Sequence, residues 1–307
     1  LFPLLKNKNF DTPQACWLFL EKKTLAMQIQ TGEFGPFSSA IAGLDGAIWD
    51  LLARKNNLPL AEFLGGSIRD LPVYASGLNP ADGPEVVAQS RDLGFRAFKQ
   101  KIGFGADIDQ KNLQSICANL KSNEQLMVDV NQGWSIEQVR DIAPIINLFS
   151  LSWIEEPLLA NATREDWQEC ATLLTAPLAG GENLRWEAFA EQSAWLKIIQ
   201  PDVGKWGGVT GNWLVAKNTL QRGLRYCPHW LGSGIGLLTS AHVLSAIGGD
   251  GLLELDVNEN PLRELLAEPF PQVSNGTFQL SQQTGIGVIP NLKQAHQWLT
   301  HHQESSK

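Results

Sequence analysis

The sequence lacks the features that mark a zinc ribbon, a disulfide framework or a nucleic-acid groove. Its four cysteines, Cys16, Cys117, Cys170 and Cys227, form no CxxC pair, so we expect reduced thiols in a cytoplasmic protein. Lysine and arginine total 24 against 32 acidic residues, and the net charge of −8 argues against a nucleic-acid partner. An anionic substrate is still allowed, because a metal ion or buried lysines can create a local positive site.

Signals for export or for a membrane are also lacking. No signal-peptide pattern opens the chain, and only residues 230–249 are free of Asp, Glu, Lys and Arg over a length that could span a bilayer. That stretch contains His242, serines and glycines, so we interpret it as a buried loop and helix and expect no membrane partner. Methionine is limited to Met27 and Met127 and the numbering starts at Leu1, so we expect residues before it in the natural protein.

What is present is a regular alternation of short apolar runs and amphipathic segments from residue 71 onward. Eight strands alternating with helices are typical of parallel βαβ units, and this number predicts a closed α/β barrel of the TIM type. A doubly wound open sheet is the alternative, but it usually has fewer strands, and no GxGxxG turn follows the first run. The predicted strands lie in 71–76, 95–104, 125–131, 149–156, 176–182, 195–202, 224–229 and 251–256, and the predicted helices in 84–93, 106–120, 135–146, 163–174 and 208–222.

The segments on either side of this alternation differ from it. In residues 1–70 the pattern predicts one helix over 38–55, capped by Ser38 or Ser39, and a short helix over 60–64. We therefore expect a small helical piece packed against a barrel that spans 71–260. The segment 261–307 is rich in loops and prolines.

Polar residues stand at the ends of the predicted strands, where barrel enzymes carry their catalytic groups. Every run from the second to the eighth ends in an ionisable residue, each about one βα unit after the last. These residues would therefore converge on one mouth of the barrel. They are Lys99 and Lys101, Asp129 and Asn131, Glu155 and Glu156, Glu182, Asp202, His229, and Glu254 with Asp256.

Three of these carboxylates, Asp129, Glu155 and Glu182, come from consecutive strands. Neighbouring carboxylates repel one another and raise their own pKa values, a cost that a divalent cation removes. All-oxygen ligation, completed by water and substrate, suits Mg²⁺. Each carboxylate alone could simply cap the next helix, but their common register predicts a magnesium site. Side-chain alternation further predicts that Glu155 and Glu156 do not both face the barrel axis.

Candidate proton-transfer groups flank the carboxylates. Lys99 and Lys101 are two residues apart, so both should face the axis, and crowding of the two ammonium groups is expected to lower the pKa of each. Asp202 and His229 end neighbouring strands, and a carboxylate beside an imidazole fixes its tautomer. The alternatives are a solvated lysine pair and a structural histidine. A metal with bases on both sides suits abstraction of a proton α to a carboxylate.

Seven stretches together resemble the mandelate racemase subgroup of the enolase superfamily across nearly the whole chain. They are AGLDGAIWD (42–50), FKQKIG (98–103), VDVNQGW (128–134), WIEEP (153–157), GGEN (180–183), PDVGKWGGVTG (201–211) and PHW (228–230). The resemblance implies an α/β barrel with an N-terminal capping domain. In the family that domain opens with an antiparallel meander, whereas residues 1–70 show only its helical part. The resemblance also implies that 261–307 packs back on the cap.

The resemblance assigns roles on the first half of the mouth. Asp129, Glu155 and Glu182 match the Mg²⁺ ligands of the family. Lys101 matches the base that serves one face of the substrate, and Lys99 matches its partner, which contacts the substrate carboxylate.

On the second half of the mouth, His229 matches the base for the opposite face and is paired to Asp202. Glu254 matches a carboxylate that hydrogen-bonds the enediolate, and we expect Asn131 to contact the substrate. The related muconate-lactonising subgroup carries a lysine where this chain has Asp202, which favours the racemase-type site. We assign no chemistry to Lys205.

A small-molecule carboxylate is therefore the expected partner, either a sugar acid or another 2-hydroxy acid. Through one enediolate, loss of the β-hydroxyl gives a 2-keto-3-deoxy acid, and the resemblance favours this dehydration. Return of the proton to the α-carbon instead gives racemisation or epimerisation. A non-catalytic, metal-binding barrel with an incomplete cap is the second alternative, although every acid, base and ligand position is filled. A homo-oligomer is expected.

Overall fold

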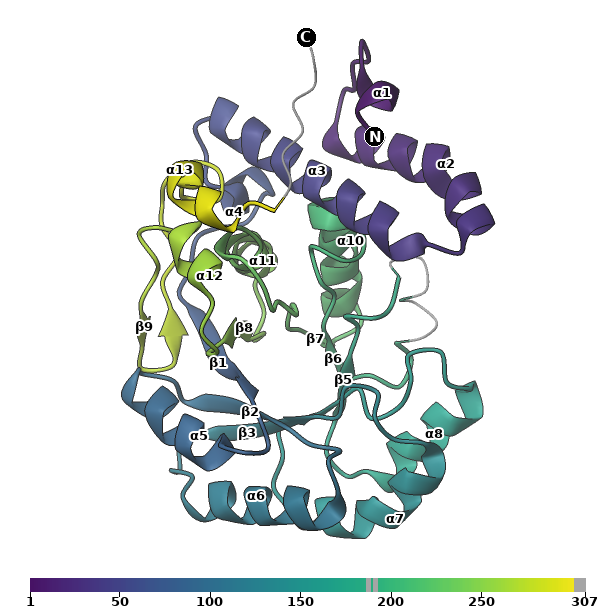
Figure 1. Cartoon of the computed structure of the whole chain (residues 1–307), viewed down its shortest axis with the longest axis vertical. Coiled ribbons are helices and arrows are strands. Elements are labelled where there is room, and N and C mark those ends of the chain that lie inside the picture. The colour runs from purple at the N-terminus through teal and green to yellow at the C-terminus, as the bar shows by residue number, and fades with distance from the viewer. Residues whose placement is uncertain (186–188, 190–192, 301–307) are drawn as a thin grey trace.

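The computed structural model describes residues 1–185, 189 and 193–300, and its strands form the predicted barrel (Figure 1). Neighbouring strands pair in parallel from β1 to β7, and β8 pairs with the other edge of β1, so the first and last strands meet. All eight strands fall within the predicted runs or within two residues of them. They are β1 (Leu71–Leu78), β2 (Ala97–Lys101), β3 (Gln125–Asp129), β4 (Ile154–Glu155), β5 (Leu178–Gly180), β6 (Ile198–Ile199), β7 (Arg225–Tyr226) and β8 (Leu253–Asp256).

Helices cover the outside of the barrel, and the five predicted between strands are confirmed. Ser135 and Gln138 form a reciprocal capping box at the start of α7, and Thr163 caps α8. The uncharged stretch after Trp230 forms a largely buried helix, α11, as interpreted. In the described part of the chain, no helix is both long and apolar enough to cross a bilayer. The helices are α5 (Gly83–Asp92), α6 (Ala106–Ala118), α7 (Ile136–Ile146), α8 (Arg164–Leu173), α10 (Gly208–Gln221) and α11 (Gly234–Ile247).

The barrel interior is filled by a compact apolar layer that forms the floor beneath the strand ends. Tyr74 and Trp153 meet edge to face, with ring centroids 5.3 Å apart. Because this layer fills the interior, the polar side chains at the carboxyl ends of the strands form the mouth of the barrel. Its buried members come from or flank the eight strands and are Tyr74, Ala97, Met127, Trp153, Ala179, Ile198, Cys227 and Leu252.

The cap contains a long helix that the sequence reasoning missed. Helix α2 (Pro13–Thr31) is capped by Thr12, starts with proline and ends at Gly32 with φ 70°, all three of which are recognisable boundary signals. It packs on α3 through Trp17 and Leu20. The predicted Ser38 or Ser39 cap is wrong, because α3 begins one turn earlier. The remaining cap helices are α1 (Phe2–Leu5), α3 (Phe34–Lys55) and α4 (Leu60–Phe63).

The C-terminal segment runs along the barrel and then reaches the cap helices. Ile286 N donates to Asp50 Oδ1 on α3 at 2.7 Å, and Leu60 N on α4 donates to Gly285 O at 2.7 Å. Its hairpin was not predicted, although the Asn275-Gly276 turn, with φ 48° and 77°, is a typical hairpin signal. Residues 301–307 lie outside the described part. The elements are α12 (Pro261–Leu265), β9 (Val273–Ser274), β10 (Thr277–Phe278), α13 (Leu292–Ala295) and a 3₁₀ turn, His296–Trp298.

Candidate active site

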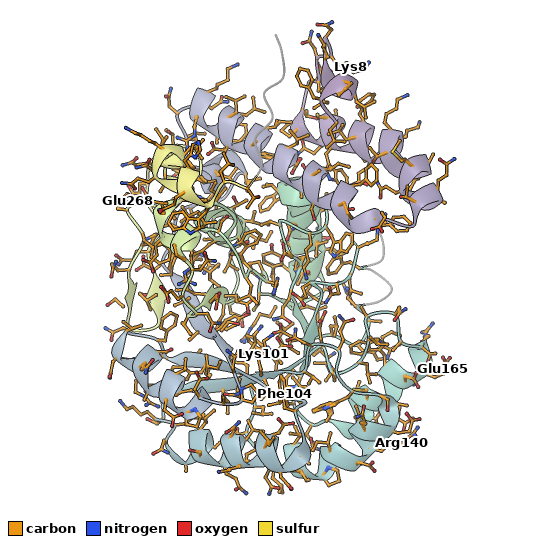
Figure 2. All side chains as sticks on the ribbon, viewed as in Figure 1. Lys8, Lys101, Phe104, Arg140, Glu165 and Glu268 are labelled. Carbon is orange, nitrogen blue, oxygen red and sulfur yellow. The ribbon has the colours of Figure 1, made fainter. Side chains whose placement is uncertain are left out.

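The parallel register brings the predicted residues to one level at the barrel mouth. Lys101 is paired with Asp129 across β2 and β3, and Asp129 is paired with Glu155 across β3 and β4. Paired residues in a sheet project on the same face, so these three side chains point together. In Figure 2, Lys101 lies near the middle of the molecule, whereas Arg140 and Glu165 are on outer helices.

Lys99 is sealed inside the site and is surrounded by carboxylates. Its Nζ lies 2.7 Å from Glu155 Oε1, 2.7 Å from Glu254 Oε1 and 3.6 Å from Asp129 Oδ2, and its side chain is 0% exposed. Burial opposes its charge, but Glu155 and Glu254 outweigh burial and raise the pKa of Lys99 well above its usual value. The prediction that crowding lowers this pKa is wrong, because the ammonium contacts carboxylates rather than the other lysine.

Lys101 is the lysine that a ligand can reach. Its Nζ lies 2.6 Å from Asp129 Oδ2 and its side chain is 16% exposed, and it also donates to Asn131 Oδ1. Asn131 N in turn donates to Asp129 Oδ1 at 2.8 Å. Asn131 has φ 47°, a strained conformation of the kind that collects at functional sites. The structure thus brings Lys101, Asp129 and Asn131 together.

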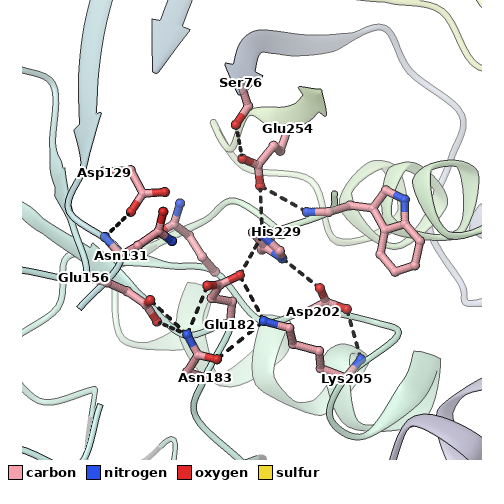
Figure 3. A network of polar contacts seen from close by, with 12 residues as sticks. Ser76, Asp129, Asn131, Glu156, Glu182, Asn183, Asp202, Lys205, His229 and Glu254 are labelled. Atoms are coloured by element: carbon pink, nitrogen blue, oxygen red, sulfur yellow. Dashed lines mark hydrogen bonds and ion pairs between the residues drawn. The ribbon is translucent and has the colours of Figure 1, made fainter. Parts of the chain in front are cut away.

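His229 and Asp202 form a buried pair on the other side of the mouth (Figure 3). His229 Nδ1 lies 2.7 Å from Asp202 Oδ2, and Nε2 lies 2.6 Å from Glu182 Oε2. Asp202 Oδ1 accepts hydrogen bonds from Gly204 N and Lys205 N. Burial lowers the pKa of His229, but Glu254, Asp202 and Glu182 together raise it well above the usual value.

Glu254 links the lysine and histidine halves of the site. It is fully buried, and Ser76 Oγ donates to its Oε1 at 2.6 Å, where Lys99 also binds. Its Oε2 accepts from Trp230 N and lies 3.9 Å from His229 Nε2. Burial alone would raise its pKa, but Lys99 and His229 lower the pKa of Glu254 to about 2. Asp256, two residues on, instead faces Arg263 at 3.6 Å.

Glu182 lies in a second polar cluster that sequence reasoning recovered only in part. Asn183 Nδ2 donates to both oxygens of Glu156 and to Glu182 Oε1, and Lys205 Nζ donates to Glu182 Oε2 at 3.2 Å (Figure 3). Burial opposes ionisation of Glu182, but the hydrogen bond and charge of His229 lower the pKa of Glu182 well below its usual value. The cluster therefore holds one firmly ionised carboxylate.

Glu155 and Glu156 are both buried at the mouth, Glu155 against Lys99 and Glu156 against Asn183, which strand alternation did not predict. Strand β4 ends at Glu155, and Glu156 has φ 40°, so the period of two no longer holds there. Burial raises the pKa of Glu155 to about 7, with Lys99 opposing it. Burial, together with Glu182 and Glu155, raises the pKa of Glu156 to about 8. Burial and neighbouring carboxylates therefore oppose the ionisation of both Glu155 and Glu156.

The donor chemistry of the mouth fits a hard divalent cation. In the part of the chain that the structure describes, no three His, Cys, Asp or Glu side chains already stand in metal-binding geometry. Asp129, Glu155 and Glu182 are held instead by Lys101, Lys99 and His229. Their buried carboxylate oxygens are the ligands that Mg²⁺ prefers. A cation would offset both the burial of Glu155 and the charges of Asp129 and Glu254, which raise the pKa of Glu155.

Several residues of the site were not among those predicted from the sequence. Gln200 Nε2 donates to Glu155 Oε2 at 2.6 Å, and Trp153 Nε1 donates to the same oxygen at 3.2 Å. Asn183 follows Glu182 directly, and Lys205 lies three residues after Asp202, so both could have been proposed from their proximity to predicted ligands. No sequence pattern marks Gln200.

Comparison with known proteins gives a consistent result over both parts of the chain. Residues 84–295 match the family model described as enolase C-terminal domain-like. Residues 1–65 match the N-terminal domain described as mandelate racemase / muconate lactonizing enzyme. Among curated proteins, the chain is 26% identical to D-galactarolactone cycloisomerase of Agrobacterium fabrum, covering 85% of this chain and 74% of the relative. It is 25% identical to arabinonate dehydratase of Saccharolobus solfataricus, covering 94% and 78%.

Solved structures share the fold over most of this chain. A mandelate racemase/muconate lactonizing enzyme from Bordetella bronchiseptica RB50 superposes with a TM-score of 0.91 at 42% identity, covering 95% of this chain and 82% of that one. An enolase from Bradyrhizobium, complexed with magnesium and mandelic acid, superposes with a TM-score of 0.81 at 28% identity, covering 93% and 77%.

Proposed function

Because the chain belongs to the mandelate racemase/muconate lactonizing enzyme family of the enolase superfamily, we propose that it dehydrates a sugar acid to a 2-keto-3-deoxy acid. One observation carries the proposal: Lys101 binds Asp129, the first of the three carboxylates in strand order, and the His229–Asp202 pair binds Glu182, the last of them. The names of the relatives, among them a sugar-acid dehydratase and a sugar-lactone cycloisomerase, support substrates of this class.

We further propose that Asp129, Glu155 and Glu182 hold one Mg²⁺. When bound, the ion would act as a Lewis acid that draws in the substrate carboxylate and offsets the charge that develops on it. The magnesium in the Bradyrhizobium relative supports this choice of metal. Lys99, which is sealed between Glu155 and Glu254, would balance the charge of these carboxylates from behind the site.

Proton transfer is assigned to Lys101 and His229. Lys101, in its neutral form, takes the α-proton at Nζ, and the C–H electron pair forms the carbon–carbon double bond of the enediolate. His229 then gives the Nε2 proton to the β-hydroxyl, which leaves as water while the enediolate electrons form the new double bond. The resulting enol becomes the 2-keto acid. Asp202 holds Nδ1 of His229 in place throughout.

Racemisation or epimerisation is the second candidate, and the same arrangement of Lys101 and His229 supports it. If His229 returns a proton to the α-carbon on the face opposite Lys101, the substrate is inverted rather than dehydrated. The mandelic acid bound by the Bradyrhizobium relative supports a 2-hydroxy acid of this kind.

One assay separates these functions. A library of sugar acids and 2-hydroxy acids would be incubated with the protein and Mg²⁺ in D₂O, with 2-keto acid and α-deuterium both recorded. Keto acid from one compound supports dehydration and identifies the substrate. Deuterium uptake without keto acid supports racemisation. A protein that binds Mg²⁺ but gives neither signal contradicts both and supports a non-catalytic barrel.

A further inference from the structure

Helix α10 begins directly after the loop that carries Asp202 and Lys205, and it lacks a cap of its own. Its N-cap residue is Gly207, with φ 83°, no side-chain cap bond is present within the described residues, and no acidic residue lies in its first turn. The first backbone N–H groups of a helix need acceptors from outside the helix. For a buried helix start this need is strong, because an unsatisfied N–H in the interior is costly.

Asp45 of the cap helix α3 supplies these acceptors. Its Oδ2 accepts from Thr210 N at 2.8 Å and its Oδ1 accepts from Thr210 Oγ1 at 2.7 Å, while the residue is only 2% exposed. Trp49, one turn further along α3, donates from Nε1 to Thr210 Oγ1 at 2.9 Å. Gly208 has φ 58°, and a Cβ built there would lie 2.7 Å from Asp45 Oδ2. The cap helix α3 is thus hydrogen-bonded to, and closely packed against, the start of α10.

The loop before α10 is tied to the active site at several points. Asn212 Nδ2 donates to Asp202 O at 3.3 Å and to Gly208 O at 2.8 Å. Trp206 Nε1 donates to Glu182 O at 2.9 Å. A displacement of the first turn of α10 would therefore also displace Asp202 and Glu182, because a short, hydrogen-bonded segment connects them.

We propose that Asp45 is a positioning residue through which the cap holds the loop 202–207 in place. This loop carries Asp202, which pairs with His229, and Lys205, which binds Glu182. Asp45 touches none of the reacting groups and acts through Thr210. The tie between cap and loop is independent of the proposed function. Only the role of this tie in catalysis rests on the proposed function.

The first test compares Asp45→Ala and Asp45→Asn with Asp50→Ala. Asp50 lies on the same helix but binds Arg54 and Ile286 of the C-terminal segment, so its loss destabilises the cap without touching the loop. Backbone hydrogen exchange over residues 203–211 is expected to quicken about tenfold or more in Asp45→Ala. The increase should be smaller in Asp45→Asn, which keeps an acceptor, and absent in Asp50→Ala. Equal exchange in Asp45→Ala and wild type would overturn the proposal.

A second readout keeps this inference separate from the proposed function and does not need a substrate. Calorimetric Mg²⁺ affinity should weaken about tenfold in Asp45→Ala and remain at the wild-type value in Asp50→Ala when both are folded at the assay temperature. Unchanged affinity in Asp45→Ala removes the link to the metal site. A wild-type protein that binds no Mg²⁺ contradicts the proposed function, while the exchange experiment still decides whether Asp45 holds the loop.

Discussion

His229 Nδ1 lies 2.7 Å from Asp202 Oδ2, so the carboxylate fixes which imidazole nitrogen keeps its proton. The other nitrogen, Nε2, lies 2.6 Å from Oε2 of Glu182. The proposed acid is thereby joined to a proposed metal ligand, and both face the mouth of the barrel. A substitution at His229 should therefore alter one step of the reaction, and a substitution at Glu182 should alter metal binding, in both cases without unfolding the barrel.

His229→Asn should lower dehydration about 10²–10⁴-fold, the usual cost of losing a general acid or base. Lys101 would still take the α-proton, so exchange of that proton with D₂O should continue and can be followed by NMR with Mg²⁺ present. Lys101→Ala is the matched comparison and should lose both exchange and product formation. Full dehydration in His229→Asn would rule out the assigned acid.

Glu182→Gln should weaken Mg²⁺ binding by about tenfold or more, because an ionised ligand oxygen is replaced by a neutral amide. The matched control is Glu169→Gln on α8, which removes the same charge from an exposed ion pair with Arg140. Isothermal titration calorimetry measures both without a substrate. Equal affinity in the two variants would take Glu182 off the list of proposed ligands.

The stability of the protein should fall in mild acid because of His242. This residue is fully buried between α4, α11 and the C-terminal segment, and its Nδ1 accepts a hydrogen bond from Ala61 N at 3.2 Å. Burial lowers the pKa of His242 to about 4. Between about pH 6.5 and 4, His242 binds a proton in the unfolded chain but not in the folded chain. The free energy of unfolding therefore decreases as the pH decreases, by about 3 kcal/mol in all.

Urea unfolding of wild type and His242→Gln at neutral pH and at about pH 4.5 measures this effect. The acid-induced loss should be smaller in His242→Gln, whose side chain does not titrate. His296→Gln, a change at an exposed histidine, is the control and should lose as much as wild type. An equal loss in His242→Gln and wild type would mean that other groups drive the acid sensitivity.

Gly208→Ala should destabilise the fold more than Gly223→Ala does. Both glycines have positive φ, 58° and 68°, so alanine at either costs about 1–2 kcal/mol of backbone strain. Only at Gly208 would the new Cβ also meet the Asp45 carboxylate, whereas nothing lies within 4 Å at Gly223. Denaturant unfolding compares the two variants. Equal destabilisation would show that the Asp45 side chain moves aside without lowering the free energy of unfolding.

The predictable part of this protein is the part that local sequence controls. Periodicity located the strands and the helices between them, since a strand or an amphipathic helix leaves its mark within a dozen residues. Helix α2 carries boundary signals at Thr12-Pro13 and Gly32, but its buried face includes the polar Thr24 and Gln28, which weakens its apolar pattern. The strand-end positions of Lys101, Asp129 and Glu155 followed from the register of the barrel.

By itself, the sequence determined the barrel, its polar mouth and the family, because each depends on short-range pattern and order along the chain. Only the tertiary structure decided three further features: the charge state of Lys99, the burial of Glu156 at the site, and the hydrogen bonds of Asp45 to the start of α10. Each of these depends on which groups from distant segments share a buried space. Desolvation and charge pairing act through space, and separation along the chain does not encode them.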